Sequence, residues 1–130
     1  MEIDLLKKKI TSFKKALGTL NEIIQNGVNS TIERDALIHR FEYTFEVFWK
    51  SAKLYLWRIH GLDLSSPKKV IRGLLQVNLF SEDIVVTALE MVDDRNLSVH
   101  TYNEKFADEM SSKIPEYYNI MKIYLNNINY

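Results

Sequence analysis

The chain has 130 residues, of which 46% are hydrophobic and 26% are charged; this composition can bury one core and excludes intrinsic disorder. Its 17 basic and 17 acidic residues balance, which argues against a general nucleic-acid coat protein, because non-specific binding depends on a basic excess. Four glycines and two prolines are too few for a β-sandwich or barrel. The absence of cysteine excludes disulfides, thiolate metal sites and a cysteine nucleophile.

A single domain spanning residues 1–130 is expected, because this length suits one core and no linker or repeat interrupts it. The N-terminal residues are acidic and no apolar run follows them, so no signal peptide is predicted. No apolar stretch approaches the ~20 residues that cross a bilayer. We therefore expect no membrane association and a cytoplasmic location, with which the lack of cysteine agrees.

Two long helices are predicted in the first half of the chain. The first covers residues 3–26, where apolar residues recur at three- and four-residue spacing. The second begins after Ser30, which forms a capping box with Glu33. It runs to about His60, and Gly61 ends it.

Aromatic side chains are dense along the second predicted helix. Most of them share one stripe at helical spacing, which is the ordinary pattern of a buried core. Tyr43 and Trp57 fall outside that stripe. The alternative is that part of this aromatic surface faces a second copy of the chain, because aromatic residues are enriched at interfaces. A homodimer is expected on that ground. Glu46 and Lys50 are spaced for an i,i+4 ion pair.

Two more helices follow in the second half. Ser66 and Pro67 begin a short third helix, since serine caps helices and proline suits their first position. Residues 78–80 form a turn, and Ser81 caps a fourth helix that ends near Arg95.

The fifth predicted helix starts at about Tyr102 and contains Pro115, which should kink or restart it. The tail formed by residues 126–130 is expected to fray. No segment shows the sustained alternation of a strand. The predicted fold class is therefore all-α, an up-and-down bundle of four long helices and one short one.

The junction before the fifth helix is the strongest candidate for a functional site, because it combines carboxylates, amides, an arginine, a histidine and a tyrosine. If Thr101 caps the fifth helix and Glu104 reaches back to it, the chain turns at His100. Such a corner can aim Arg95, His100 and Tyr102 into one cleft. In one continuous helix, Arg95 and His100 would instead diverge by about 140°.

A purely structural junction is the alternative, in which Arg95 pairs with Asp93, Asp94 or a helix-end carbonyl. An arginine and a histidine five positions apart are weak evidence alone, and the pattern recurs at Arg34 and His39. Only the occurrence at Arg95 is followed by an asparagine and, two positions after its histidine, by a tyrosine.

Motifs for several other chemistries are missing. The sequence has no P-loop, no dinucleotide-binding glycine pattern and no zinc-protease or serine-hydrolase motif. His39, His60 and His100 are too far apart to indicate a zinc site. We expect no metal and no cofactor. The chain also lacks a nucleotidyltransferase motif, so a second polypeptide would have to supply that chemistry.

Three stretches resemble known families. The residues from Arg95 to Tyr102 resemble the R-x4-H-x-Y signature of HEPN-domain proteins of the HepT type. Residues 40–50, RFEYTFEVFWK, are similar to the R-F-E-Y-T-F-E-x-x-W-K run of the nucleotidyltransferase substrate-binding proteins. Residues 66–72, SPKKVIR, are similar to the S-P-R-x-V-I-R run of that family, with Lys68 where arginine is usual. The resemblance covers nearly the whole chain.

The HEPN resemblance implies a helical bundle that dimerises so that the arginine–histidine corners of two subunits face one cleft. Many HEPN proteins are metal-independent ribonucleases. By this resemblance His100 would be the general acid/base, a role that histidine commonly takes in proteins. Arg95 would hold the scissile phosphate, and Asn96 would orient either group.

The resemblance also implies a partner, because these families are encoded beside a small nucleotidyltransferase. In HepT-type pairs the partner is an antitoxin that attaches AMP to the signature tyrosine, here Tyr102. The substrate-binding branch has instead been described as binding the substrate of the partner transferase.

Three hypotheses therefore stand. The chain is a partner subunit of a minimal nucleotidyltransferase in a toxin–antitoxin-like pair, with a nucleotide or RNA site at Arg95, Asn96, His100 and Tyr102. It is itself a metal-independent ribonuclease toxin that uses Arg95 and His100 and is silenced at Tyr102. Or it is a non-catalytic helical adaptor.

Overall fold

The computed structural model describes residues 2–101 and 103–130. In chain order its helices are α1 (Glu2–Asn26), α2 (Thr31–His60), α3 (Pro67–Gln76), α4 (Glu82–His100) and α5 (Glu104–Asn127). The described residues contain no strand, so the all-α prediction is confirmed. None of the described helices combines the length and hydropathy that crossing a bilayer requires.

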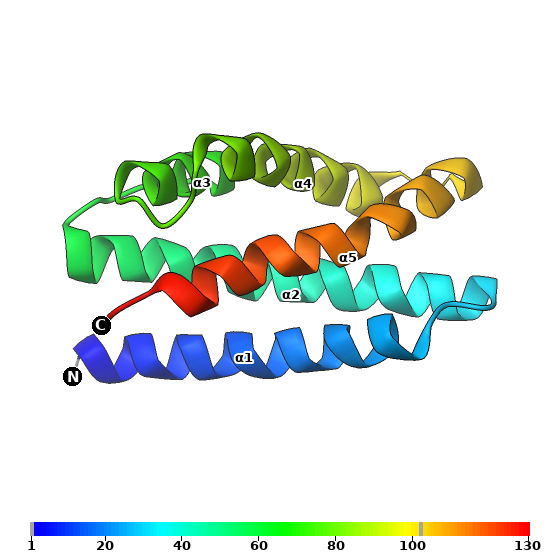
Figure 1. Cartoon of the computed structure of the whole chain (residues 1–130), viewed down its shortest axis with the longest axis horizontal. Helices are drawn as coiled ribbons and strands as arrows, with labels where there is room; N and C mark the ends of the chain where they lie inside the picture. The colour runs from blue at the N-terminus through cyan, green and yellow to red at the C-terminus, as the bar shows by residue number, and fades with distance from the viewer. Residues whose placement is uncertain (1, 102) are drawn as a thin grey trace.

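The four long helices alternate in direction, as Figure 1 shows. The short α3 lies beside the beginning of α4, and these two helices form one side of the bundle. The long α2 occupies the middle, where it packs against each of the other helices. The predicted up-and-down bundle with one short helix is therefore the observed architecture.

Local capping signals set most of the helix starts. The Ser30, Ser66 and Ser81 hydroxyls accept hydrogen bonds from the backbone N–H groups three residues later, at 3.1, 3.4 and 3.3 Å, which satisfies donors that a helix start leaves free. Gly61 ends α2 with a φ of 70°, a left-handed conformation that glycine adopts without strain. All four predictions for these residues are confirmed.

One core, built on the aromatic stripe of α2, holds the bundle together. Phe13 from α1 lies 5.7 Å from both Phe48 of α2 and Tyr124 of α5, measured between ring centroids. All three rings are buried, and burying each contributes roughly 1.5–3 kcal/mol. Tyr43 and Trp57, which lie outside the stripe, are 37% and 48% exposed.

The predicted end of the fourth helix is wrong. The helix α4 does not stop near Arg95 but continues to His100, and Thr101 is its C-cap, with its N–H donating to the carbonyl of Leu97 at 2.9 Å. Thr101 is therefore not the N-cap of α5. That position belongs to Asn103, whose side-chain oxygen accepts from the backbone N–H of Phe106 at 3.0 Å.

The fifth helix differs from its prediction in two further respects. Glu104 does not act as a capping partner of Thr101 but pairs with Arg34, at 2.6 Å. The helix also does not restart at Pro115, which lies inside α5. Pro115 is exposed, so water can reach the carbonyl of Ser111 that a proline leaves without its helical N–H donor.

Candidate functional site

The extended α4 separates two of the predicted site residues. Arg95 and His100 lie on one continuous helix, where five positions correspond to a rotation of about 140°. Within one chain the two side chains therefore diverge, and the predicted corner that aims both into one cleft is not formed. His100 is exposed, whereas the Arg95 side chain is only 21% exposed. Tyr102, the third predicted member, lies outside the described residues.

Arg95 reaches across to α2. Its Nη2 donates to Glu46 Oε2 in an ion pair, and its Nη1 donates to Asn96 Oδ1 at 3.4 Å. The guanidinium carbon lies 5.3 Å from the ring centroid of Phe45, within the range of a cation–π contact. Its Nε is buried without a hydrogen-bond partner.

The structural alternative for Arg95 also named the wrong partners. Asp93 pairs with Lys68 at 2.8 Å, and Asp94 accepts a hydrogen bond from the Tyr117 hydroxyl. The pairing with Glu46 is a long-range contact that links two of the stretches singled out in the sequence.

Glu46 contacts Lys50, Trp49 and Arg95. Its Oε1 lies 3.0 Å from Lys50 Nζ, which confirms the predicted i,i+4 pair, and its Oε2 accepts from Trp49 Nε1 at 3.2 Å. Burial opposes ionisation of Glu46, but the hydrogen bonds from Lys50 and Trp49 and the charge of Arg95 outweigh it and lower the pKa of the carboxyl. Glu46 is therefore a carboxylate at neutral pH.

A second carboxylate of the same stretch also holds α4. Ser98 Oγ donates to Glu42 Oε2 at 2.6 Å. Because α2 and α4 run in opposite directions (Figure 1), Glu42 and Glu46 on successive turns of α2 meet Ser98 and Arg95 on successive turns of α4. Residues 40–50 thus fix the rotation of α4 about its axis.

The far side of α4 is anchored to α5. Asp94 is buried and lies 3.5 Å from Lys113 Nζ, which also pairs with Glu90 at 2.8 Å. Burial and the hydrogen bond to Asp94 raise the pKa of the Tyr117 hydroxyl, so it remains a donor at neutral pH. Contacts on both sides therefore hold Arg95 in one orientation.

A cleft of about 420 Å³ opens beside Arg95. We call it the Arg95 cleft. It lies between α2, the start of α3 and the C-terminal half of α4, and its lining residues are Glu46, Trp49, Ser66, Pro67, Lys68, Val92, Arg95 and Asn96. Each of the three stretches that carry the family resemblance contributes to this lining.

Comparison with known proteins identifies the family. A family model described as nucleotidyltransferase substrate binding protein like matches residues 8–129. The chain belongs to this family. No curated protein matches it.

Solved structures give the fold. A crystal structure of a protein from Thermus thermophilus is 46% identical, with a TM-score of 0.83, and the match covers 88% of this chain and 96% of that one. A tri-AMPylated HEPN toxin of Shewanella oneidensis, in complex with an MNT antitoxin, is 18% identical over 95% of both chains, with a TM-score of 0.75. A toxin–antitoxin with AMP-PNP, 16% identical over 95% of this chain and 96% of that one, has a TM-score of 0.71. The bundle is therefore HEPN-like.

The Arg95 cleft of this family member is chemically suited to a phosphate group. Its lining carries two cations, Lys68 and Arg95, and one carboxylate, Glu46. The Lys68–Asp93 pair is exposed, and such pairs contribute little, so an anion can compete for the lysine. His100 is not among the lining residues, so in one chain the cleft has no histidine acid or base. Among the described residues no group of three or more acidic or histidine side chains could hold a metal ion.

Sequence reasoning found Arg95 and Asn96 but missed Glu46, Trp49 and Lys68 as members of the cleft. The signal was present, because all three residues belong to the stretches that carry the family resemblance. The sequence does not reveal how α2, α3 and α4 are rotated and shifted relative to one another, and that arrangement brings these stretches together.

Proposed function

We propose that this chain is the HEPN-type partner subunit of a minimal nucleotidyltransferase in a toxin–antitoxin-like pair. In this proposal the Arg95 cleft binds a phosphate group of a nucleotide or RNA. The observation that carries it is the convergence of the three family stretches on one cleft with two cations.

The proposed partner rests on the family and on the structural relatives. The family description refers to a nucleotidyltransferase, and the Shewanella oneidensis HEPN toxin is in complex with an MNT antitoxin. This chain has no nucleotidyltransferase motif of its own, so the catalytic carboxylates and their metal would come from the partner.

Phosphate binding at Arg95 is compatible with its ion pair to Glu46. Among the described residues, the Nη1 of Arg95 makes only one long hydrogen bond, to Asn96, and it can turn to a stronger acceptor. An anion can therefore bind Nη1 while Nη2 keeps its ion pair with Glu46, which Lys50 and Trp49 also hold in place.

Tyr102 is the proposed acceptor of AMP. In that transfer the phenolic oxygen bonds to the α-phosphorus of ATP, pyrophosphate leaves and the phenolic proton is released. The product adds bulk and a negative charge two residues after His100. The test is intact-protein mass spectrometry after incubation with ATP, Mg²⁺ and the transferase encoded beside the chain. Wild type should gain one or more AMP groups and Tyr102→Phe none; equal gain by both would exclude Tyr102 as the acceptor.

A ribonuclease is the second candidate, favoured by the exposure of His100, Leu97 and Val99 in the last turn of α4. Because Arg95 and His100 diverge within one chain, such an activity would need a homodimer in which the Arg95 of one copy meets the partner copy's histidine. Arg95→Ala and His100→Ala would then each be inactive on RNA in EDTA, and mixed dimers of the two would recover part of the activity. If the mixed dimers recover no RNA cleavage, this shared site is excluded. If both variants change only the stability of the fold, the result supports the adaptor hypothesis.

A further inference from the structure

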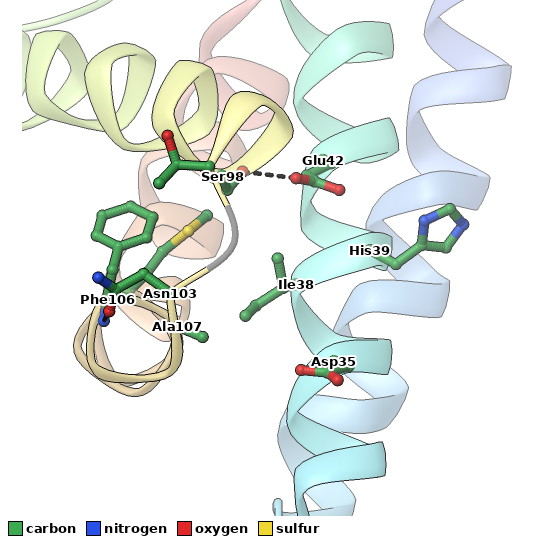
Figure 2. Close-up of a pocket in the computed structure, with 10 residues that line it drawn as sticks. Asp35, Ile38, His39, Glu42, Ser98, Asn103, Phe106 and Ala107 are labelled. Atoms are coloured by element: carbon green, nitrogen blue, oxygen red, sulfur yellow. Dashed lines mark hydrogen bonds between the residues drawn. The ribbon is translucent and has the colours of Figure 1, made fainter.

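A cavity of about 220 Å³ lies between α2, the end of α4 and the start of α5. Figure 2 shows it, with Asp35, Ile38 and Glu42 on the α2 side and Phe106 and Ala107 across from them. None of its lining residues belongs to the Arg95 cleft. We propose that this cavity, the α2–α5 pocket, binds an aminopurine base.

The floor of the α2–α5 pocket is apolar. Ile38, Phe106, Ala107 and Met110 contribute to it from two helices, and Met110 is fully buried while the other three are half-buried. A flat heteroaromatic ring gains from leaving water against such a surface, and an aromatic side chain adds a stacking partner.

The rim of the pocket supplies hydrogen-bond acceptors. Glu42 Oε2 accepts a hydrogen bond from the Ser98 hydroxyl, and Glu42 Oε1 has no partner among the described residues. Asp35 Oδ1 accepts hydrogen bonds from the Arg34 guanidinium, and Asp35 Oδ2 likewise has no partner among the described residues. Carboxylate oxygens pair with the N–H donors on the edge of adenine or guanine. The two negative charges also keep a phosphate out of the pocket, so it selects the base alone.

His39 does not add chemistry to this pocket. His39 is one of the lining residues, but Figure 2 shows its ring pointing away from Glu42 and Ser98. The ring lies 5.7 Å from that of Tyr43, edge to face. The α2–α5 pocket is therefore a binding site with no histidine in position to move a proton.

The base can come from two sources. Thr101 and Asn103 both line the pocket, and Tyr102, which stands between them in the sequence, lies outside the described residues. The occupant is either a free nucleotide or the adenine of AMP attached to Tyr102. The second source rests on the proposed function, whereas binding of a free base does not.

Calorimetric titration of the whole chain with adenosine tests the pocket without involving a phosphate. Adenosine should bind at least as tightly as AMP, because the acidic rim repels the phosphate. Purine riboside, which has the same ring system but no amino group, should bind about tenfold more weakly, since a hydrogen bond to a charged acceptor is lost. Uridine should bind more weakly still.

Variants locate the binding in the pocket. Ala107→Phe fills it and should abolish adenosine binding, while Ser112→Phe, on an exposed site of the same helix, should not. Glu42→Gln keeps an acceptor for Ser98 but removes the charge, and should weaken binding about tenfold with the fold intact. Arg95→Ala should leave adenosine binding unchanged. A wild type that binds adenosine but neither binds nucleic acid nor accepts AMP would therefore count against the proposed function and not against the pocket.

Treatment with the transferase and ATP separates the two sources. If attached AMP fills the pocket, treated wild type stops binding adenosine and treated Tyr102→Phe still binds it. If both still bind, the pocket takes a free nucleotide. The proposal is overturned if wild type does not bind adenosine at millimolar concentration, or if Ala107→Phe and Glu42→Gln bind it as wild type does.

Discussion

The side chain of Arg95 is oriented by two residues of α2 and by its neighbour Asn96. Its Nη2 pairs with Glu46, its guanidinium carbon lies over the Phe45 ring, and its Nη1 donates to Asn96. A free arginine side chain would have to lose rotamer freedom on binding a phosphate, so prior fixation reduces the entropy lost at that step. Glu46 thus acts as a positioning residue for the proposed phosphate site.

The lowered pKa of Glu46 makes a stability prediction. Because its folded-state pKa lies below the ordinary value of a glutamate, the carboxylate contributes stability above the unfolded pKa and loses it as the pH falls through the folded pKa. Glu46→Gln should lower the free energy of unfolding by about 1 kcal/mol at neutral pH. The difference from wild type should shrink in acid, as measured by urea unfolding across pH. A difference independent of pH would contradict the assigned charge state; Glu22→Gln is the control at an exposed site.

The hydroxyl of Tyr117 should matter more than that of its neighbour. Among the described residues, Tyr117→Phe leaves the buried Asp94 carboxylate with only the longer contact to Lys113, which should destabilise the fold by about 1–3 kcal/mol. Tyr118 is half-buried and has no hydrogen bond from its hydroxyl among the described residues, so Tyr118→Phe should stay within about 0.5 kcal/mol of wild type. Equal effects of the two changes in urea unfolding would remove the structural role assigned to Asp94.

At the scale of the helices, three of the predicted capping residues were correct. Ser30, Ser66 and Ser81 each cap the helix that follows them. Near the end of α4, two candidate caps stand two residues apart, Thr101 and Asn103, and the sequence pattern favoured the wrong one.

The extension of α4 beyond Arg95 has a tertiary cause. Leu97, Ser98 and Val99 are indifferent helix formers, and intrinsic propensity predicted a break among them. The hydrogen bond from Ser98 to Glu42 holds this turn against α2. Packing of this kind overrides propensity, and nothing in the local sequence reveals it.

The cap of α5 gives a direct test of the corrected boundary. Asn103→Ala should destabilise the fold by about 1 kcal/mol, because the N–H of Phe106 loses its acceptor. Thr101→Ala should have a smaller effect, since the cap contact of Thr101 is made by its backbone N–H. Thermal melting followed by circular dichroism would show the order of the two variants, and the reverse order would restore Thr101 as the cap.

At the scale of the molecule, the sequence predicted the bundle but not the assembly of the site. The helical periodicities and the family resemblance were sufficient for the number and order of the helices. The Arg95 cleft depends on how α2, α3 and α4 are rotated and shifted relative to one another. That register is determined by contacts such as Arg95 with Glu46, between residues 49 positions apart, and single-sequence patterns do not contain it.

The most direct test of the proposed phosphate site is binding of a fluorescent oligouridylate, which has phosphates but no aminopurine, measured by anisotropy at several salt concentrations. Arg95→Ala should weaken binding about tenfold and lower the salt slope by about 0.7–1. Arg72→Ala, an exposed arginine of α3 outside the cleft, should bind as wild type does. No binding by wild type, or equal losses in the two variants, would contradict a phosphate site at Arg95.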